Sequence, residues 1–407
     1  MLNPAKNGGL RARQDSAMIR GNRAPSRAAL AADALSFTGM IRNATPSDLA
    51  ALVQIENRSF RTDRFSPRTF RYLLSKANAT TLVDVADDNG AKVRAYATLL
   101  FSRGTSLARL YSIAVDPEHQ GLGIGWNLLR AAEQAALDHD AVYMRLEVRA
   151  DDPVTQAFYA RAGFRKFGVQ SHYYDDDADA IRMEKSLAPR PAPELARVPF
   201  YAQSLDFTCG PAAMLMAMHA LDPQLKMDQS AELRLWREST TVFMMSGHGG
   251  CSPEGLAVAA ARRGFDVKVF LSGSGVLFID SVRSEAKKKV IRLVQEDFRG
   301  QLEERGVPVR FQPLSVEAMR REFDEGRISV VLISSYRFDR QKQPHYVVVT
   351  GFDSKYVYLN DPSVDVENEK TLTDCIQIPV LQKDFAQMAR YGRSQQKAAL
   401  VIGRSPS

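Results

Sequence analysis

The chain has 407 residues, which is long for a single hydrophobic core and, at about 150 residues per domain, indicates two or three domains. It is 45% hydrophobic and 25% charged, the composition of an ordinary globular protein, which excludes disorder over most of its length. Its apolar runs are much shorter than the roughly 18 residues that a membrane helix needs, so we expect no membrane partner. Three scattered cysteines are too few for a disulfide framework and favour a reducing, cytoplasmic setting.

The formal net charge of +7 is concentrated near the N-terminus. Residues 1–39 hold six Lys and Arg against two Asp, a net of +4, which leaves only +3 on the other 368 residues. A nearly balanced body does not favour nucleic acid as a partner. The least favoured alternative is that the arginines of this segment anchor the chain to a ribosome or another nucleic acid.

We expect residues 1–39 to form a disordered basic tail, because they are rich in Arg, Ala and Ser and lack apolar periodicity. No apolar core of roughly 7 to 15 residues follows the basic residues, so the tail does not resemble a secretory signal. Met40 opens the first folded segment directly, which favours Met40 as the true start of the protein. An Arg-rich organelle presequence is the open alternative.

Residues 40–188 alternate between predicted helices and strands, the order of a mixed α/β domain. Helices are expected over 47–58, 123–138 and 153–162, and strands over 92–102, 107–115, 142–149 and 180–185. Three alternating prolines then favour an extended spacer, so we place a Pro-rich linker at 189–196.

Residues 197–404 predict a second domain in which helices precede the sheet, the order of an α+β fold. Helices are expected to begin at Cys209 and Ser252 and to run over 284–304 and 315–325, with strands over 328–335, 346–352 and 356–359.

A glycine-rich turn, QGLGIG at 120–125, follows the strand 107–115 and leads into a helix. Small residues let backbone amides approach a phosphate, and a helix N-terminus adds about half a positive charge. The spacing is not the dinucleotide pattern GxGxxG, and no lysine follows as in a P-loop. The pattern alone leaves both a phosphate cradle and a structural turn open.

The same loop, followed by Leu128-Leu129, resembles the acetyl-CoA pyrophosphate loop of GNAT-superfamily N-acetyltransferases. The motifs LEVR at 146–149, AFY at 157–159 and AGF at 162–164 are similar to those of the bacterial ribosomal-protein-alanine acetyltransferases. The likeness covers about residues 40–187. It implies a GNAT fold, acetyl-CoA as cofactor, and an acceptor amine such as a peptide or protein N-terminus.

The resemblance also implies residue roles. Glu147 would be the base that deprotonates the acceptor, and Tyr159 the acid that protonates the departing thiolate. A solvated strand glutamate and a core tyrosine are the structural alternative. The implied cofactor-binding residues are Ile113 and Val115 beside the pantetheine, the amides of Gln120, Gly121, Gly123 and Gly125 around the pyrophosphate, and Asp152, where the family usually has Asn.

A second candidate site begins at Cys209, at the start of a predicted helix, where the helix dipole favours the nucleophilic thiolate. His345 opens a predicted strand 136 residues later, and Asp361 follows the next strand. This order fits papain-like peptidases, in which Cys and His are separated by roughly 130 to 150 residues.

The segments QSLDFTCGPAA, HYVVVTG and NDP together resemble the double-glycine leader peptidases, papain-like enzymes of bacteriocin exporters. The likeness runs loosely over 198–401. It implies a papain-like fold with Cys209 as nucleophile, His345 as base, Asp361 as the residue that orients the base, and Gln203 as an oxyanion-hole donor. Thr208 stands where that family commonly has an acidic residue.

The other cysteines and histidines do not form a recognisable site. Cys251 precedes a helix but has no histidine at matching spacing, so we interpret it as structural, and Cys375 as packing. The remaining histidines share no ligand spacing, and no metal site is predicted.

These patterns predict a fused, bifunctional enzyme that transfers acetyl from acetyl-CoA to an amine and hydrolyses a peptide bond by a Cys-His-Asp mechanism. The alternative is an acetyltransferase whose C-terminal domain is a non-catalytic peptide-binding module. A coupled scheme, in which cleavage exposes an α-amine that is then acetylated, is a further hypothesis.

Overall fold

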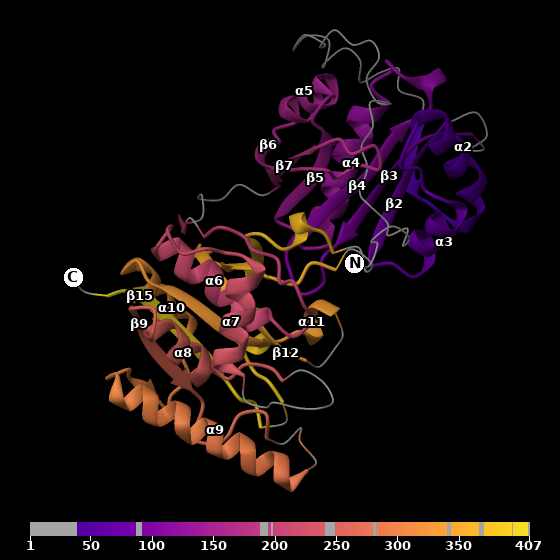
Figure 1. Ribbon diagram of the computed structural model, residues 1–407. Coiled ribbons are helices and arrows are strands. Elements are labelled where there is room, and N and C mark those ends of the chain that lie inside the picture. The colour runs from indigo at the N-terminus through magenta and orange to yellow at the C-terminus, as the bar shows by residue number, and fades with distance from the viewer. Residues whose placement is uncertain are drawn as a thin grey trace. The chain divides into compact units, whose positions relative to one another are not determined.

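The computed structural model describes residues 39–86, 92–187, 194–196, 198–240, 249–279, 282, 284–339, 343–365, 370–392 and 394–405. The chain forms two units (Figure 1). Unit 1 comprises Met1–Ser102, Ser106–Arg190 and Val366–Asp374, and unit 2 comprises Arg103–Thr105, Pro191–Asp365 and Cys375–Ser407. The predicted basic tail before residue 39 and most of the predicted linker lie outside the described residues. No helix within the described ranges is both long and apolar enough to cross a membrane.

Unit 1 is built on a seven-stranded sheet with the order β1-β2-β3-β4-β5-β7-β6. Its strands are β1 (Gly39–Asn43), β2 (Ala79–Ala86), β3 (Val93–Phe101), β4 (Leu107–Val115), β5 (Tyr143–Arg149), β6 (Arg165–Gln170) and β7 (Ala180–Ser186). Its helices are η3 (Pro46–Asp48), α2 (Leu49–Ser59), α3 (Pro67–Ser75), η4 (Pro117–His119), α4 (Ile124–Asp138), α5 (Pro153–Arg161) and η7 (Leu372–Asp374). The predicted helices and strands are all present within a few residues, and α3, β1, β2 and β6 are additional.

Helices cover both faces of this sheet, because alternate residues of each strand point to opposite sides. Leu128 and Leu129 of α4 pack in one apolar core with Leu146 and Val148 of β5. On the other face, α2 and α3 pack on β2 and β3. Glu147 lies between Leu146 and Val148 on β5, so its side chain points to the face of the sheet opposite α4.

Strands β4 and β5 are the one parallel pair in the described part of this sheet. They pair only at Leu107–Arg109 against Tyr143–Arg145. Beyond Arg109 the two strands separate, although both continue for several residues. This separation opens the sheet between the ends of β4 and β5, and the glycine-rich loop follows β4.

Unit 2 has an eight-stranded sheet with the order β10-β9-β15-β11-β12-β13-β14, and β8 pairs with β12. The strands are β8 (Glu194–Leu195), β9 (Phe265–Leu271), β10 (Val309–Arg310), β11 (Ile328–Ser334), β12 (Pro344–Phe352), β13 (Tyr356–Asn360), β14 (Ile378–Leu381) and β15 (Ala398–Arg404). The helices are α6 (Cys209–Leu221), α7 (Gln229–Ser239), α8 (Pro253–Ala261), α9 (Glu285–Glu304), α10 (Val316–Asp324), α11 (Tyr336–Asp339) and α12 (Gln382–Met388).

Serine caps begin three of the four predicted helices of unit 2. Ser252, Ser284 and Ser315 each accept a hydrogen bond from the backbone amide three residues later, at α8, α9 and α10. The predicted order of helices before sheet is only partly correct, because β9 precedes α9 and yet lies between β10 and β15. Strand β9 pairs with β10 and β15, which both come later in the sequence. Its position inside the sheet therefore could not be predicted from the local sequence.

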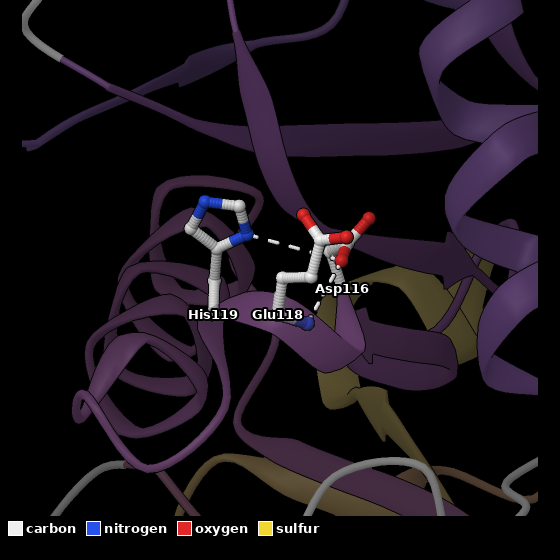
Figure 2. A group of neighbouring side chains, drawn as sticks. All are labelled: Asp116, Glu118 and His119. Carbon is white, nitrogen blue, oxygen red and sulfur yellow. Dashed lines mark hydrogen bonds and ion pairs between the residues drawn. The ribbon is translucent and has the colours of Figure 1, made fainter.

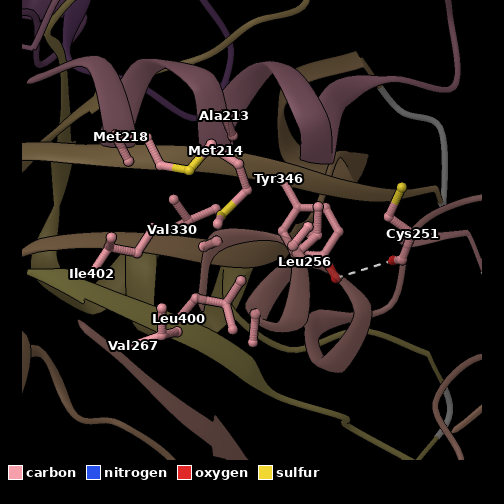
Figure 3. Close-up of a cluster of buried hydrophobic side chains, with 14 of the residues drawn as sticks. Ala213, Met214, Met218, Cys251, Leu256, Val267, Val330, Tyr346, Leu400 and Ile402 are labelled. Atoms are coloured by element: carbon pink, nitrogen blue, oxygen red, sulfur yellow. Dashed lines mark hydrogen bonds between the residues drawn. The ribbon is translucent and has the colours of Figure 1, made fainter. Parts of the chain in front are cut away.

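Helix α6 is apolar around most of its circumference and is packed on the sheet. Ten of its 13 residues are buried. Figure 3 shows Met214 and Met218 of α6 above Val330, Leu400 and Ile402 of the sheet. The residue at the start of α6 is therefore held by a well-packed element.

Candidate functional sites

The glycine-rich loop predicted to hold a pyrophosphate runs from Gln120, after η4, into the first turn of α4, where Gly125 is the second residue. Gly121 and Gly123 have φ angles of 80° and 76°, a left-handed conformation that favours glycine. Gly123 is the N-cap of α4, and no side chain caps the helix. The first amides of α4 are thus suited to an anionic ligand.

The other predicted cofactor residues lie around this loop and the end of β4. Ile113 and Val115 are buried on β4, and the Gln120 side chain donates to the Val115 carbonyl at 3.3 Å. Asp152 caps α5 by accepting from the Thr155 amide at 3.1 Å, as its sequence position predicted. Asp152 therefore has a structural role that the family's usual Asn could also fill.

Tyr159, the predicted acid, is fully buried on α5 between aromatic rings. Its ring centroid lies 5.2 Å from that of Phe158 and 5.6 Å from that of Phe164. Its hydroxyl has no hydrogen-bond partner among the described residues. Burial, with a smaller effect of the Asp152 charge, raises the pKa of Tyr159 well above its usual value, so the hydroxyl stays protonated. The unpartnered hydroxyl of Tyr159 fits the thioester of acetyl-CoA, and the uncapped start of α4 fits its pyrophosphate.

Glu147, the predicted base, lies in the middle of β5 and is only 1% exposed. Its Oε2 atom is 4.0 Å from Nε of Arg109 on β4. Burial raises the pKa of Glu147, and the charge of Arg109 opposes that rise. A carboxylate with a raised pKa is a better proton acceptor for an ammonium than an ordinary glutamate. Alternation along the strand LEVR favoured a Glu147 side chain that faces a cleft, whereas the structure buries it.

Arg109 and Asp374 are neighbours of Glu147 that the sequence analysis did not identify. Arg109 is fully buried, forms an ion pair with Asp374, and donates to the Thr371 hydroxyl at 2.7 Å. Arg145 donates to the Thr373 carbonyl at 2.8 Å. A single arginine within the apolar strand 107–115 was a usable signal for Arg109, but Asp374 lies 265 residues away in sequence and gave none.

The structure brings Cys209, His345 and Asp361 together in unit 2. Nε2 of His345 lies 2.6 Å from Oδ1 of Asp361. Burial lowers the pKa of His345, but the charge and hydrogen bond of Asp361 outweigh it and, with Cys209, raise the pKa to about 10. Burial raises the pKa of Cys209, but the hydrogen bond and charge of His345 and the amides of Tyr346 and Gly210 outweigh this effect. The pKa of Cys209 is therefore lowered overall. The pair is therefore suited to a thiolate and an imidazolium.

The approach of α6 to β12 requires a small residue after the cysteine. A Cβ atom on Gly210 would lie 3.1 Å from Leu256 and 3.2 Å from the ring of Tyr346, the neighbour of His345. Glycine at this position lets the helix start lie directly against the strand that carries the histidine.

Gln203, the predicted oxyanion-hole residue, is tied to the segment after Asp361. Its backbone amide donates to the Pro362 carbonyl at 2.9 Å, and its side-chain Nε2 donates to the Leu205 carbonyl at 3.0 Å. Thr208 is buried, and its hydroxyl donates to the same Leu205 carbonyl at 2.8 Å. Thr208 thus stabilises the turn before the cysteine and supplies no charge.

The other two cysteines are buried. Burial, together with the nearby Cys209 charge, raises the pKa of Cys251 well above its usual value, and its carbonyl accepts from the Tyr346 hydroxyl at 3.3 Å (Figure 3). The Cys375 thiol donates to the Ser363 carbonyl at 3.3 Å. Both contacts agree with structural roles.

One group of acidic and histidine side chains lies at the start of the glycine-rich region (Figure 2). Asp116, Glu118 and His119 offer ligand atoms within 4.8 Å of one another. The Arg58 guanidinium pairs with Asp116 at 3.1 Å and with Glu118 at 2.8 Å, so both carboxylates are already compensated. His248, one of the histidines without a shared ligand spacing, lies outside the described residues.

Both halves of the chain match known families. Residues 198–403 match the Peptidase_C39 like family, and residues 49–164 match the Acetyltransferase (GNAT) family. An uncharacterized N-acetyltransferase of Methanocaldococcus jannaschii is 31% identical over 147 residues, which are 36% of this chain and 90% of the relative. The ribosomal protein bS18-alanine N-acetyltransferase of Escherichia coli is 35% identical over 79 residues, 19% of this chain and 53% of the relative.

A crystal structure of the ribosomal-protein-S18-alanine N-acetyltransferase from Escherichia coli is 26% identical in sequence, covers 38% of this chain and 96% of that chain, and has a TM-score of 0.33. The sequence matches confirm the predicted GNAT acetyltransferase, and GNAT acetyltransferases use acetyl-CoA as the acetyl donor. The chain belongs to the Peptidase_C39 like family and carries a GNAT N-acetyltransferase in its N-terminal part.

Proposed function

We propose that the chain is a bifunctional cytoplasmic enzyme, which acetylates the free amine of a peptide or protein in residues 40–188 and hydrolyses a peptide bond in residues 197–404. The 2.6 Å contact between His345 and Asp361, beside a cysteine of lowered pKa, carries the peptidase assignment. Three cysteines without disulfides support a reducing compartment.

Acetyl transfer needs a base for the acceptor and an acid for the leaving thiolate. Acetyl-CoA supplies the thioester when it is bound. Glu147 would take a proton from the acceptor ammonium and so free its nitrogen lone pair. Tyr159 would supply its phenolic proton to the departing thiolate. The amides at the start of α4 hold the pyrophosphate and fix the position of the thioester.

Peptide hydrolysis uses the thiolate and imidazolium of the second site. The Cys209 sulfur attacks the carbonyl carbon, and His345 gives its proton to the departing amine. His345 then removes a proton from water, which attacks the thioester and releases the carboxylic acid and the Cys209 thiolate. Asp361 keeps the imidazole oriented throughout, and Gln203 supports the oxyanion.

The acceptor class follows from the relatives, whose names describe alanine N-acetyltransferases. An α-amine is the product of peptide hydrolysis as well as the substrate of such enzymes. The two reactions can therefore follow one another, with cleavage first and acetylation second. Equal yields of cleaved, acetylated peptide from the joined and the proteolytically separated halves would argue against coupling.

Intact mass spectrometry of a peptide library with Gly-Gly sites, incubated with acetyl-CoA and the full chain, tests both activities. We expect Cys209→Ala to abolish cleavage alone and Glu147→Gln to abolish acetylation alone. Cys375→Ala and Glu133→Gln are the matched controls, because Cys375 lies outside the triad and Glu133 on α4 forms an ion pair with Lys185 on β7. Acetylation without cleavage by any variant would instead assign unit 2 as a peptide-binding module.

A further inference from the structure

A short segment from late in the sequence completes the face of unit 1 that carries Glu147. Thr371–Asp374 belongs to unit 1, although more than 200 residues separate it from β5. Thr371, Thr373 and Asp374 are at most 5% exposed. The segment is therefore packed on the sheet as an integral part of this unit.

Charged and polar contacts attach the segment to two strands. The Asp374 carboxylate pairs with Arg109 on β4 and accepts from the Ser102 hydroxyl at 3.0 Å. The carbonyl of Thr373 accepts from Arg145 on β5 at 2.8 Å. These contacts lie at the last paired positions of β4 and β5, where the two strands begin to separate.

The segment is also internally ordered. Oδ2 of Asp374 accepts from the Thr371 amide at 3.0 Å and from the Thr371 hydroxyl at 3.1 Å, which closes a tight turn. Asparagine at 374 would keep the contact with the Thr371 amide through its side-chain oxygen, but it would lose the charge and the oxygen that accepts from Ser102. This allows the ion pair with Arg109 to be tested separately from the turn.

The segment lies close to the base, because Arg109 contacts both Asp374 and Glu147. Burial raises the pKa of Glu147, and the charge of Arg109 opposes that rise. The Thr373 side chain opposes it to a smaller extent, which places Thr373 near this carboxylate. An acceptor ammonium must reach Glu147, yet that side chain has no exposed surface. Acetylation thus requires a neighbouring segment to move, and Thr371–Asp374 holds Arg109, the charged partner of Glu147.

We infer that Thr371–Asp374 is an intramolecular competitor of the acceptor, and that the acceptor is a peptide with an acidic side chain close to its free amine. Such a side chain takes the place of the Asp374 carboxylate on Arg109, while the amine reaches Glu147. This inference rests on the proposed role of Glu147 and extends it to the class of acceptor.

The test uses the full chain, acetyl-CoA and two short peptides that differ only in Asp or Asn after the N-terminal alanine. With the wild type, we expect the Asp peptide to have a KM about tenfold lower, the effect of one charge-assisted contact. In Asp374→Asn the KM for the Asn peptide falls several-fold because the competitor is weakened. Asp384→Asn, which removes an ion pair with Arg337 on unit 2, is the control and leaves both KM values unchanged.

Hydrogen exchange of the wild type gives a measurement that does not depend on any variant folding correctly. We expect the Asp peptide to increase amide exchange over 370–374, whereas the Asn peptide has a smaller effect. Equal KM values for the two peptides, or unchanged exchange over 370–374 with saturating Asp peptide, would overturn the inference. An active Glu147→Gln would instead refute the proposed function, so the two failures are distinguishable.

Discussion

The imidazole of His345 and the carboxylate of Asp361 are joined by a 2.6 Å contact through Nε2, which leaves Nδ1 as the ring atom available to Cys209. Because this contact fixes the ring orientation and stabilises the imidazolium, Asp361→Asn is expected to lower kcat for peptide cleavage by about a thousandfold. The assay compares cleavage rates of wild type, Asp361→Asn and the control Asp384→Asn. An unchanged kcat in Asp361→Asn would contradict the assignment of Asp361 as the orienting residue.

Cys209 is expected to be alkylated by iodoacetamide about tenfold faster at pH 7 than an ordinary thiol, since its lowered pKa increases the thiolate fraction. Cys251 should react slowest, because burial raises its pKa. The Cys209 rate falls as the pH drops through its lowered pKa. Peptide mapping by mass spectrometry measures each site, and His345→Ala should slow Cys209 at pH 7. Uniform rates for all three cysteines would rule out an activated thiol.

The acetylation rate is expected to rise with pH through the raised pKa of Glu147, because the base must be ionised to accept a proton. Arg109 on β4 and Arg182 on β7 lower this pKa, whereas Asp374 raises it. Asp374→Asn should therefore move the acidic limb of kcat/KM to lower pH. The pH profile of kcat/KM is measured between about pH 5 and about pH 9. A shift to higher pH would contradict the assigned role of Asp374.

Asp48 is expected to stabilise unit 1 through Arg42. Both carboxylate oxygens accept from the guanidinium at 2.8 Å, and the Thr45 amide donates at 2.7 Å. The Arg42 hydrogen bond is the main cause that lowers the pKa of Asp48 from 3.8 to about 2, so its stabilising contribution is present above pH 3.8 and is lost as the pH falls through about 2. Asp48→Asn should lower the free energy of unfolding by about 2 kcal/mol at pH 7.

Tryptophan fluorescence can measure the stability of unit 1 for the Asp48 prediction. It contains two tryptophans, Trp126 in unit 1 and Trp236 in unit 2. In a Trp236→Phe background, fluorescence during urea denaturation reports on unit 1 alone. A loss of stability that persists unchanged at pH 2 would contradict the linkage.

Local patterns were sufficient to predict most of the elements that position the sites. The helix after QGLGIG, the strand LEVR and the helix at Cys209 depend on caps, glycines and periodicity within a few residues. Gly123 is the N-cap of α4 and Asp152 is the N-cap of α5, at the starts of two predicted helices. The catalytic and cofactor-binding roles and the domain bounds stay predictions.

Contacts between distant segments were not predictable in this way. The contact of Arg109 with Asp374 depends on how a segment 265 residues away packs, and no periodicity encodes it. For the same reason strand alternation favoured a cleft-facing Glu147, whereas the structure buries it beside Arg109, which contacts Asp374. The position of β9 inside the second sheet is likewise set by pairing with β15.

Helix α6 joins the proposed nucleophile to the most buried element of unit 2, since Cys209 is its first residue and most of the others are buried. A side chain that repositions α6 also repositions the thiolate relative to His345. Random mutagenesis that selects for inactive peptidase should therefore recover substitutions at Met214 or Met218 alongside those in the triad. Such alleles would be temperature-sensitive, whereas triad alleles would be inactive at every temperature.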